Sequence, residues 1–166
     1  MLYTSSEAAK LLRKLNEEKL SFENYEKQSS VFNASVNENA ESVRPAYSYR
    51  DTQRKIDEIN RKIRTVKHAI NKFNLENEVP GFGMTIDQML VYLPQLSAKK
   101  NKLMTMQNRL PKQREPIRFT GIIEYSYANY DVDEVRRDYS EVSDELSRAQ
   151  TALDVLNNSV RFEIDI

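Results

Sequence analysis

The stretch that decides the fold is IDEINRKIRTVKHAINKF, residues 56–73. Its apolar side chains are spaced alternately three and four residues apart, which keeps one stripe of a helix facing a partner helix. The stripe consists of Ile56, Ile59, Ile63, Val66, Ile70 and Phe73. Basic residues fill many of the positions between them. The pattern therefore predicts a long amphipathic helix over residues 48–74.

The same spacing occurs in three further segments, each of which is predicted to be a long helix. The segment 131–158 has the stripe Val132, Val135, Tyr139, Val142, Leu146, Ala149, Leu153 and Leu156. The segment 5–27 has the stripe Ala8, Leu11, Leu15, Phe22 and Tyr25, with Glu18 where an apolar residue is expected. The segment 85–110 begins with Ile86, Met89, Leu93 and Leu96 and continues in a shifted frame with Leu103, Met106 and Leu110.

The shift of frame lies beside Pro94. A proline inside a helix removes a backbone hydrogen bond and clashes with the preceding turn, which costs about 3 kcal/mol or more. We therefore expect a bent helix here, or two shorter helices that meet at Tyr92 to Pro94.

Side-chain caps are expected where the stripes begin. In each case Thr or Asp precedes Glu or Gln by three residues, the arrangement in which each side chain binds the other's backbone N–H. The pairs are Thr4 with Glu7, Thr85 with Gln88, and Asp131 with Glu134. The turn at residues 79–83 contains Pro80, Gly81 and Gly83 and predicts an antiparallel helical hairpin over residues 48–110.

Two segments around the last helix read as strands. Residues 117–127 are rich in aromatic and β-branched types, and residues 160–166 alternate apolar with charged side chains. The two strands can pair with each other through a right-handed crossover, or they can pair between subunits. The sequence does not distinguish these two arrangements. Between the first two helices, residues 28–48 form a long polar connection in which Val31, Phe32 and Val36 are the candidate anchors.

These elements together predict a mainly α fold, with antiparallel long-helix hairpins or a four-helix bundle of coiled-coil character and a small β element near 117–127 and 160–166. The length of 166 residues suits a single domain over 1–166, organised as the connection 28–48, the hairpin 48–110 and a strand–helix–strand segment 117–166. Only three glycines are present, which argues against a phosphate-binding loop and an all-β fold.

Composition limits the partners. The chain carries 25 basic and 25 acidic residues, so we expect no nucleic-acid partner. It has no cysteine, which fits a reducing compartment, and its start has no secretory signal pattern, so we predict a cytoplasmic protein. The longest apolar run, residues 89–93, is far shorter than the about 20 residues that span a bilayer, so no membrane association is expected.

Candidate chemical groups are sparse. His68 is the only histidine and falls on the outward face of its helix, so we interpret it as a solvated surface residue. Carboxylates three or four residues apart resemble those that hold divalent cations in all-helical phosphohydrolases, but among 25 acidic residues such pairs arise by chance. The candidates are Glu38 with Glu41, Asp131 with Glu134, and Glu141 with Asp144 and Glu145. We predict no catalytic residue, no metal site and no cofactor.

Tyrosine is abundant, with nine residues. Those at 47, 49, 125, 127 and 130, with Arg50 and Arg118 nearby, can form a stacking surface for a base or a partner side chain. The simpler interpretation is that their rings cover the strands and helix ends while the hydroxyls stay in water. The first helix is amphipathic enough to lie on a membrane surface, but its polar face mixes charges of both signs, which favours a partner helix.

The order of elements, with Ile59-Asn60-Arg61 in the second helix and Leu153-Asp154-Val155-Leu156-Asn157 at the end of the last, resembles the septicolysin-like family of small, uncharacterised bacterial helical proteins. The turn with Pro80 and Gly81 and the strand-like tail depart from that pattern. The resemblance implies a bacterial origin and a helical architecture. Its name implies a cytolysin, but it assigns no catalytic or binding residue to this chain.

The narrow stripes need facing partners, so the leading hypothesis is a non-enzymatic helical protein that self-associates as a homo-oligomer or binds another protein. A carboxylate–metal phosphohydrolase of the all-helical type is one alternative, and a membrane-active, cytolysin-like protein is the other.

Overall fold

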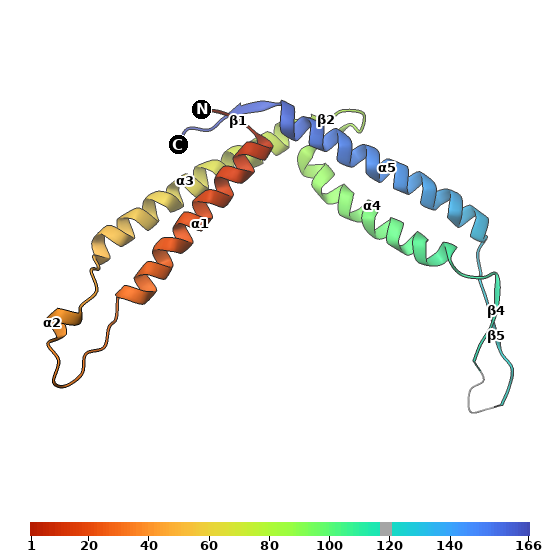
Figure 1. Ribbon diagram of the computed structural model, residues 1–166. Helices are drawn as coiled ribbons and strands as arrows, with labels where there is room; N and C mark the ends of the chain where they lie inside the picture. The colour runs from red at the N-terminus through yellow and green to blue at the C-terminus, as the bar shows by residue number, and fades with distance from the viewer. Residues whose placement is uncertain (117–120) are drawn as a thin grey trace. The chain divides into compact units, whose positions relative to one another are not determined.

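The computed structural model describes residues 1–116 and 121–166, and these are mainly helical with short antiparallel strand pairs (Figure 1). The predicted fold class is therefore confirmed. The chain has two compact units, of which unit 1 comprises Met1–Glu76 and Asn157–Ile166, and unit 2 comprises Asn77–Leu156. The predicted hairpin over 48–110 takes one helix from each unit and stays a prediction, as does the single domain.

Unit 1 is built on two long helices that lie side by side (Figure 1). Its elements are β1 (Leu2–Thr4), α1 (Ser5–Ser29), α2 (Ala40–Val43), α3 (Tyr49–Glu76) and β6 (Arg161–Glu163). Thr4 caps α1 as predicted, because its hydroxyl accepts from the Glu7 N–H at 3.2 Å and the Glu7 carboxylate accepts from the Thr4 N–H at 2.9 Å. The two helices run in opposite directions.

The α1/α3 seam buries the stripe that the sequence predicts for α3. Ile59, Ile63 and Val66 pack with Ala8 and Leu15 of α1 in one apolar cluster. The α1 stripe differs from the prediction towards its end. Tyr25 is 42% exposed, whereas the neighbouring Glu26 is half-buried and accepts hydrogen bonds from the α3 side. Glu26 can be half-buried in the seam because hydrogen-bond donors from the α3 side satisfy its carboxylate.

A two-stranded sheet closes one end of unit 1. β1 pairs antiparallel with β6, with Tyr3 opposite Phe162. Phe162 stacks on Phe73 of α3, with ring centroids 4.6 Å apart, and Ile164 beyond β6 is 1% exposed. The predicted terminal strand is therefore confirmed, and it pairs within the chain. β1 was not predicted, because three residues carry too little pattern.

The connection between α1 and α3 is held by tyrosines, and of the three predicted anchors only Phe32 is half-buried, with the Arg44 guanidinium over its ring. Val31 and Val36 are 76% and 102% exposed, so the expectation that they anchor to the core is wrong. The Tyr25 hydroxyl donates to the Ala46 carbonyl, and the Tyr47 hydroxyl donates to Glu26 at 2.6 Å. The connection is polar and has little apolar area to bury, so the hydrogen bonds donated by the tyrosine hydroxyls fix its position.

Unit 2 contains the second pair of long helices, α4 (Ile86–Gln107) and α5 (Val132–Ser159, of which the last three residues belong to unit 1). Its strands are β2 (Glu78–Val79), β3 (Met84–Thr85), β4 (Lys112–Arg114) and β5 (Tyr125–Tyr127). β2 and β3 form a small hairpin whose turn needs Gly81 and Gly83, at φ 82° and 59°, in the left-handed region that glycine adopts without strain. Thr85 and Gln88 form the predicted capping box of α4.

α4 passes through Pro94 as one continuous helix, so the alternative of two shorter helices is wrong. The buried residues Met89, Leu96 and Leu103 are seven apart and form a single seam along its length. The shift of frame in the sequence therefore has another cause, which is that half-buried residues beside this row, Tyr92, Leu93 and Met106, pack against the same apolar cluster as Leu96 and Leu103.

The α4/α5 seam is antiparallel and joins Leu96 and Leu103 to Val135, Val142 and Leu146. The predicted α5 stripe is confirmed, with Tyr139 half-buried at its edge. Asp131 caps α5, because its carboxylate accepts from the backbone N–H of Asp133 at 2.8 Å.

The strand predicted over 117–127 is present in part. Residues 117–120 lie outside the described residues, and Tyr125–Tyr127 form β5. β5 pairs antiparallel with β4, and β6 pairs with β1, so the crossover pairing of the two predicted strands is not formed in the described part of the chain. We call the β4–β5 pair the arm.

Candidate interaction surface

His68 offers no site. It lies exposed on α3, as the stripe predicts, and it has no second histidine or cysteine to act with in the sequence. A lone exposed imidazole is an ordinary surface residue.

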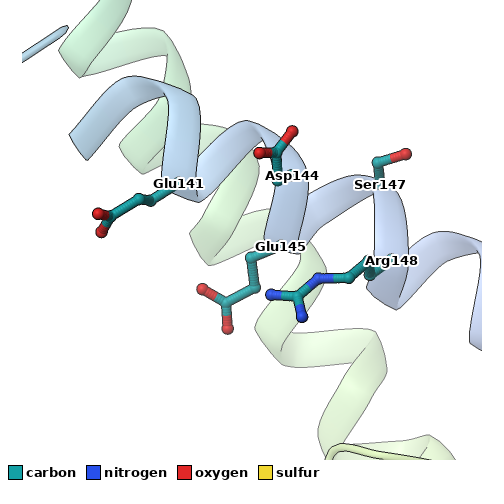
Figure 2. Close-up of a pocket in the computed structure, with 5 residues that line it drawn as sticks. All are labelled: Glu141, Asp144, Glu145, Ser147 and Arg148. Carbon is teal, nitrogen blue, oxygen red and sulfur yellow. The ribbon is translucent and has the colours of Figure 1, made fainter. Parts of the chain in front are cut away.

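The acidic residues of α5 line a shallow hollow, but they do not converge (Figure 2). All five lining residues come from this one helix, namely Glu141, Asp144, Glu145, Ser147 and Arg148. Figure 2 shows the carboxylates of Glu141 and Asp144 pointing in different directions. Within residues 1–116 and 121–166, no three His, Cys, Asp or Glu side chains are grouped to hold a metal ion.

Glu145 has a structural partner across the seam. It accepts a hydrogen bond from the Tyr92 hydroxyl of α4 at 2.5 Å. This bond raises the pKa of Tyr92, since an ionised phenol next to a carboxylate is disfavoured and partial burial adds to the effect. Glu145 thus ties α4 to α5, and it is not a free metal ligand.

The other two acidic pairs act locally. Glu38 accepts from the Ser35 N–H at 3.2 Å, and Glu41 forms an ion pair with Arg44 at 2.7 Å. Asp131 is occupied as the cap of α5. No two of these carboxylate pairs form one site.

The tyrosines belong to two separate groups. Tyr47 is half-buried against Glu26 in unit 1, whereas Tyr49 is 68% exposed beside the exposed Arg50. In unit 2, the Tyr130 hydroxyl donates to the Met106 carbonyl at 2.9 Å. Arg118 lies outside the described residues. The ordinary interpretation, in which rings pack and hydroxyls find partners, holds for Tyr47 and Tyr130.

Tyr125 and Tyr127 share one face of the arm with a lysine. In the register of the two strands Lys112 is opposite Tyr127, and its Nζ lies 4.4 Å from the Tyr125 ring centroid and 5.5 Å from the Tyr127 centroid. A cation over an aromatic face is attracted to the ring quadrupole. The two rings are 46% and 64% exposed, so this face already has its cation and remains open to solvent.

One side of α4, next to its buried seam, carries a row of residues at heptad spacing. We call this row the outer α4 stripe, and it consists of Leu90, Leu93, Ser97, Lys100 and Met104, of which Leu93 also packs against the α4/α5 cluster. The spacing is three, four, three and four, which places all five on one face of the helix. Leu90 and Met104 are each 49% exposed, and the other three are half-buried.

The outer α4 stripe adjoins one flank of α5. The Lys100 Nζ lies 5.9 Å from the ring centroid of Tyr139, so these two side chains meet across the helix pair. Ser143 is one turn after Tyr139 on the same face of α5. Its hydroxyl oxygen is buried and has no hydrogen-bond partner in the part of the chain that the structure describes.

The two helices differ in charge. From residue 88 to residue 107, α4 carries Lys99, Lys100 and Lys102 and no acidic residue. From residue 133 to residue 145, α5 carries six acidic residues and two arginines. Unit 2 therefore presents a basic helix next to an acidic one, which the balanced composition of the chain conceals.

Within the described residues, no helix combines the length and the apolar character that a membrane-spanning segment requires.

Comparison with known proteins gives a fold and no activity. No family model matches the sequence, and no curated protein matches it. Among solved structures, the chain is similar to a functionally unknown conserved protein from Corynebacterium diphtheriae, with a TM-score of 0.65 and 16% sequence identity. The similarity covers 98% of this chain and 100% of that chain. The likeness is one of fold.

Sequence reasoning missed that Leu90 and Met104 stay half-exposed beside the α4/α5 seam. The signal was present as the shift of frame near Pro94, where α4 has apolar residues at more positions than one narrow stripe contains.

Proposed function

We propose that this chain is a non-enzymatic helical protein that works by self-association. The observation that carries the proposal is the set of large apolar side chains that stay exposed on the long helices of both units.

This exposure arises because each unit is built on only two long helices. A pair of helices buries one stripe of each and leaves the other sides in water. Large apolar side chains are exposed on several of these sides, including Leu20 at 56%, Leu90 at 49% and Met104 at 49%. Apolar side chains left in water on unpartnered sides of helices support a role in protein–protein contact.

A further copy of the chain is the simplest partner, because it is present wherever the chain is made and most soluble oligomers are symmetric homo-oligomers. Light scattering coupled to size exclusion tests the proposal on the full chain at micromolar concentration. We expect a mass that is a multiple of 19.4 kDa. A single species of 19.4 kDa at every concentration would refute self-association.

The two alternatives have less support. A metal-dependent phosphohydrolase needs converging carboxylates, whereas Glu141 and Asp144 diverge and Glu145 is bonded to Tyr92. A membrane-active role comes only from the name of the septicolysin-like family. We propose membership of that family from Ile59-Asn60-Arg61 and the end of the last helix, as a statement about architecture, and a cytoplasmic location from the lack of cysteine.

A further inference from the structure

We propose that one face of the arm binds single-stranded nucleic acid. The face consists of Lys112, Arg114, Tyr125 and Tyr127, and we call it the arm face. In the antiparallel register Lys112 lies opposite Tyr127, and Arg114 lies opposite Tyr125. Side chains that are directly opposite each other on paired strands share one face of the sheet, so the two cations and the two rings lie together.

The arm separates its charges between its two faces. Gln113 lies opposite Ser126 on the other face, and the Glu115 N–H donates to the Glu124 carbonyl at 2.9 Å, which continues the same register. Because side chains alternate between the faces along a strand, both glutamates belong to the face opposite the tyrosines. Among the described residues of the arm, the arm face therefore carries two positive charges and no negative charge.

The two rings of the arm face are open to a ligand. Tyr125 is 46% exposed and Tyr127 is 64% exposed. The Lys112 Nζ lies over the rings, at 4.4 Å from the Tyr125 centroid and 5.5 Å from the Tyr127 centroid. An aromatic ring has two faces, so a cation over one of them leaves the other for a flat partner. A base can therefore stack on each ring while the lysine keeps its place.

Single-stranded nucleic acid has both of the groups that this face selects. Its bases offer flat π-surfaces that stack on aromatic side chains in any sequence, and its phosphates pair with lysine and arginine. Sheets that present exposed aromatic side chains to unpaired bases are a common means of binding a single strand. An acidic peptide would meet the cations and leave the rings in water, and a duplex keeps its bases stacked on one another, so neither uses the whole face.

The balanced composition of the chain sets the strength of this binding. With 25 basic and 25 acidic residues there is no long-range field that draws a polyanion to the chain. The net charge argues against attraction over a distance and leaves a local contact open. If both cations reach phosphates, log affinity should fall against log salt with a slope of about −1.4, since each phosphate contact with a single strand contributes about −0.7.

The test uses the full chain and a fluorescein-labelled oligothymidylate of about ten nucleotides, followed by fluorescence anisotropy in about 50 mM salt. Oligouridylate of the same length is titrated in parallel and distinguishes RNA from DNA as the source of the strand. We expect binding by the wild type. Tyr125→Leu with Tyr127→Leu should weaken the affinity about 5-fold or more, because leucine suits a strand but offers no π-surface. Tyr125→Phe with Tyr127→Phe keeps the rings and should bind like the wild type.

Two further variants locate the contact. The matched control is Gln113→Ala with Ser126→Ala, which changes the same two strands on the opposite face of the arm and should leave the affinity unchanged. Lys112→Gln with Arg114→Gln keeps the rings and should bring the salt slope close to zero. Circular dichroism shows that the helices are retained in each variant.

The inference fails on any of three results. The first is that the wild type binds neither oligonucleotide in about 50 mM salt. The second is that the leucine pair binds as tightly as the phenylalanine pair, or that the control loses as much affinity as the leucine pair, because the strand would then lie elsewhere. The third is that a labelled oligoglutamate binds as tightly as oligothymidylate, which would make the face a site for acidic protein. None of these results bears on self-association, because the two proposals rest on different residues.

Discussion

Two neighbouring residues of α4 separate the buried helix seam from the exposed side of the helix. Leu103 is 7% exposed and packs in the α4/α5 seam, whereas Met104 belongs to the outer α4 stripe and is 49% exposed. Replacing each by alanine in turn leaves the helix and its capping unchanged. The two variants therefore differ only in which stripe is truncated.

The expected magnitudes follow from burial. A buried leucine shortened to alanine loses about 2–5 kcal/mol of unfolding free energy, and a seam that borders on solvent places Leu103→Ala at about 2–3 kcal/mol. Complete burial of a methionine is worth about 1.5–3 kcal/mol, so a side chain that is half in water contributes about 1 kcal/mol. We expect Leu103→Ala to cost at least about twice as much as Met104→Ala in the isolated chain.

Urea unfolding followed by far-ultraviolet circular dichroism measures both values, at a protein concentration low enough for the monomer. Repeating the series at high concentration gives the second readout. Met104→Ala should then lose more stability relative to the wild type than it does at low concentration, because it weakens association, which stabilises the folded chain by mass action. Equal losses for the two variants at low concentration would refute the division of α4 into an inner and an outer stripe.

Two further predictions concern single hydrogen bonds. The hydrogen bond that Tyr47 donates to Glu26 raises the pKa of the Tyr47 phenol to about 12. In the unfolded chain this phenol ionises near pH 10, so the bond contributes fully to stability below about pH 10. The contribution is lost as the pH rises from about 10 to about 12. The pKa of Tyr47 is measured by the absorbance of tyrosinate during a pH titration of the wild type and of Glu26→Gln, with Tyr47→Phe in each background as the control. We expect a lower Tyr47 pKa in Glu26→Gln. An unchanged titration curve would contradict this. Thr85→Ala removes the cap of α4 and should cost about 1 kcal/mol in urea unfolding, whereas Thr105→Ala, on an exposed turn of the same helix, should cost nothing measurable; equal effects would show that capping is not the cause.

The helices were predictable because they depend on signals that are local in the sequence. The heptad stripes gave their extent, and the capping residues gave their starts, so that α1 and α4 begin directly after Thr4 and Thr85. The observed elements Tyr49–Glu76 and Val132–Ser159 lie within two residues of the predicted 48–74 and 131–158. Helix spacing and capping depend on residues that are close in the sequence, so the sequence alone is enough to predict them.

The strands and the anchors of the connection were harder to predict, because they depend on residues far apart in the chain. β1 exists because β6 meets it, and Phe162 is held by Phe73. The same applies to Glu26, which looks like a solvated acid in sequence and becomes a seam residue only because Tyr47 and Gln53 donate to it. Val31 and Val36 were predicted to be anchors of the connection because they are apolar, yet both side chains are exposed.

The net charge of the chain conceals a difference between two of its helices. Equal numbers of acidic and basic residues predict indifference towards charged partners, yet α4 and the first half of α5 carry opposite charges. At about 100° per residue, every acidic residue from 133 to 145 lies about 100° or more from Tyr139 around α5. The acidic charge of α5 therefore follows its amphipathic pattern, which a count over the whole chain averages out.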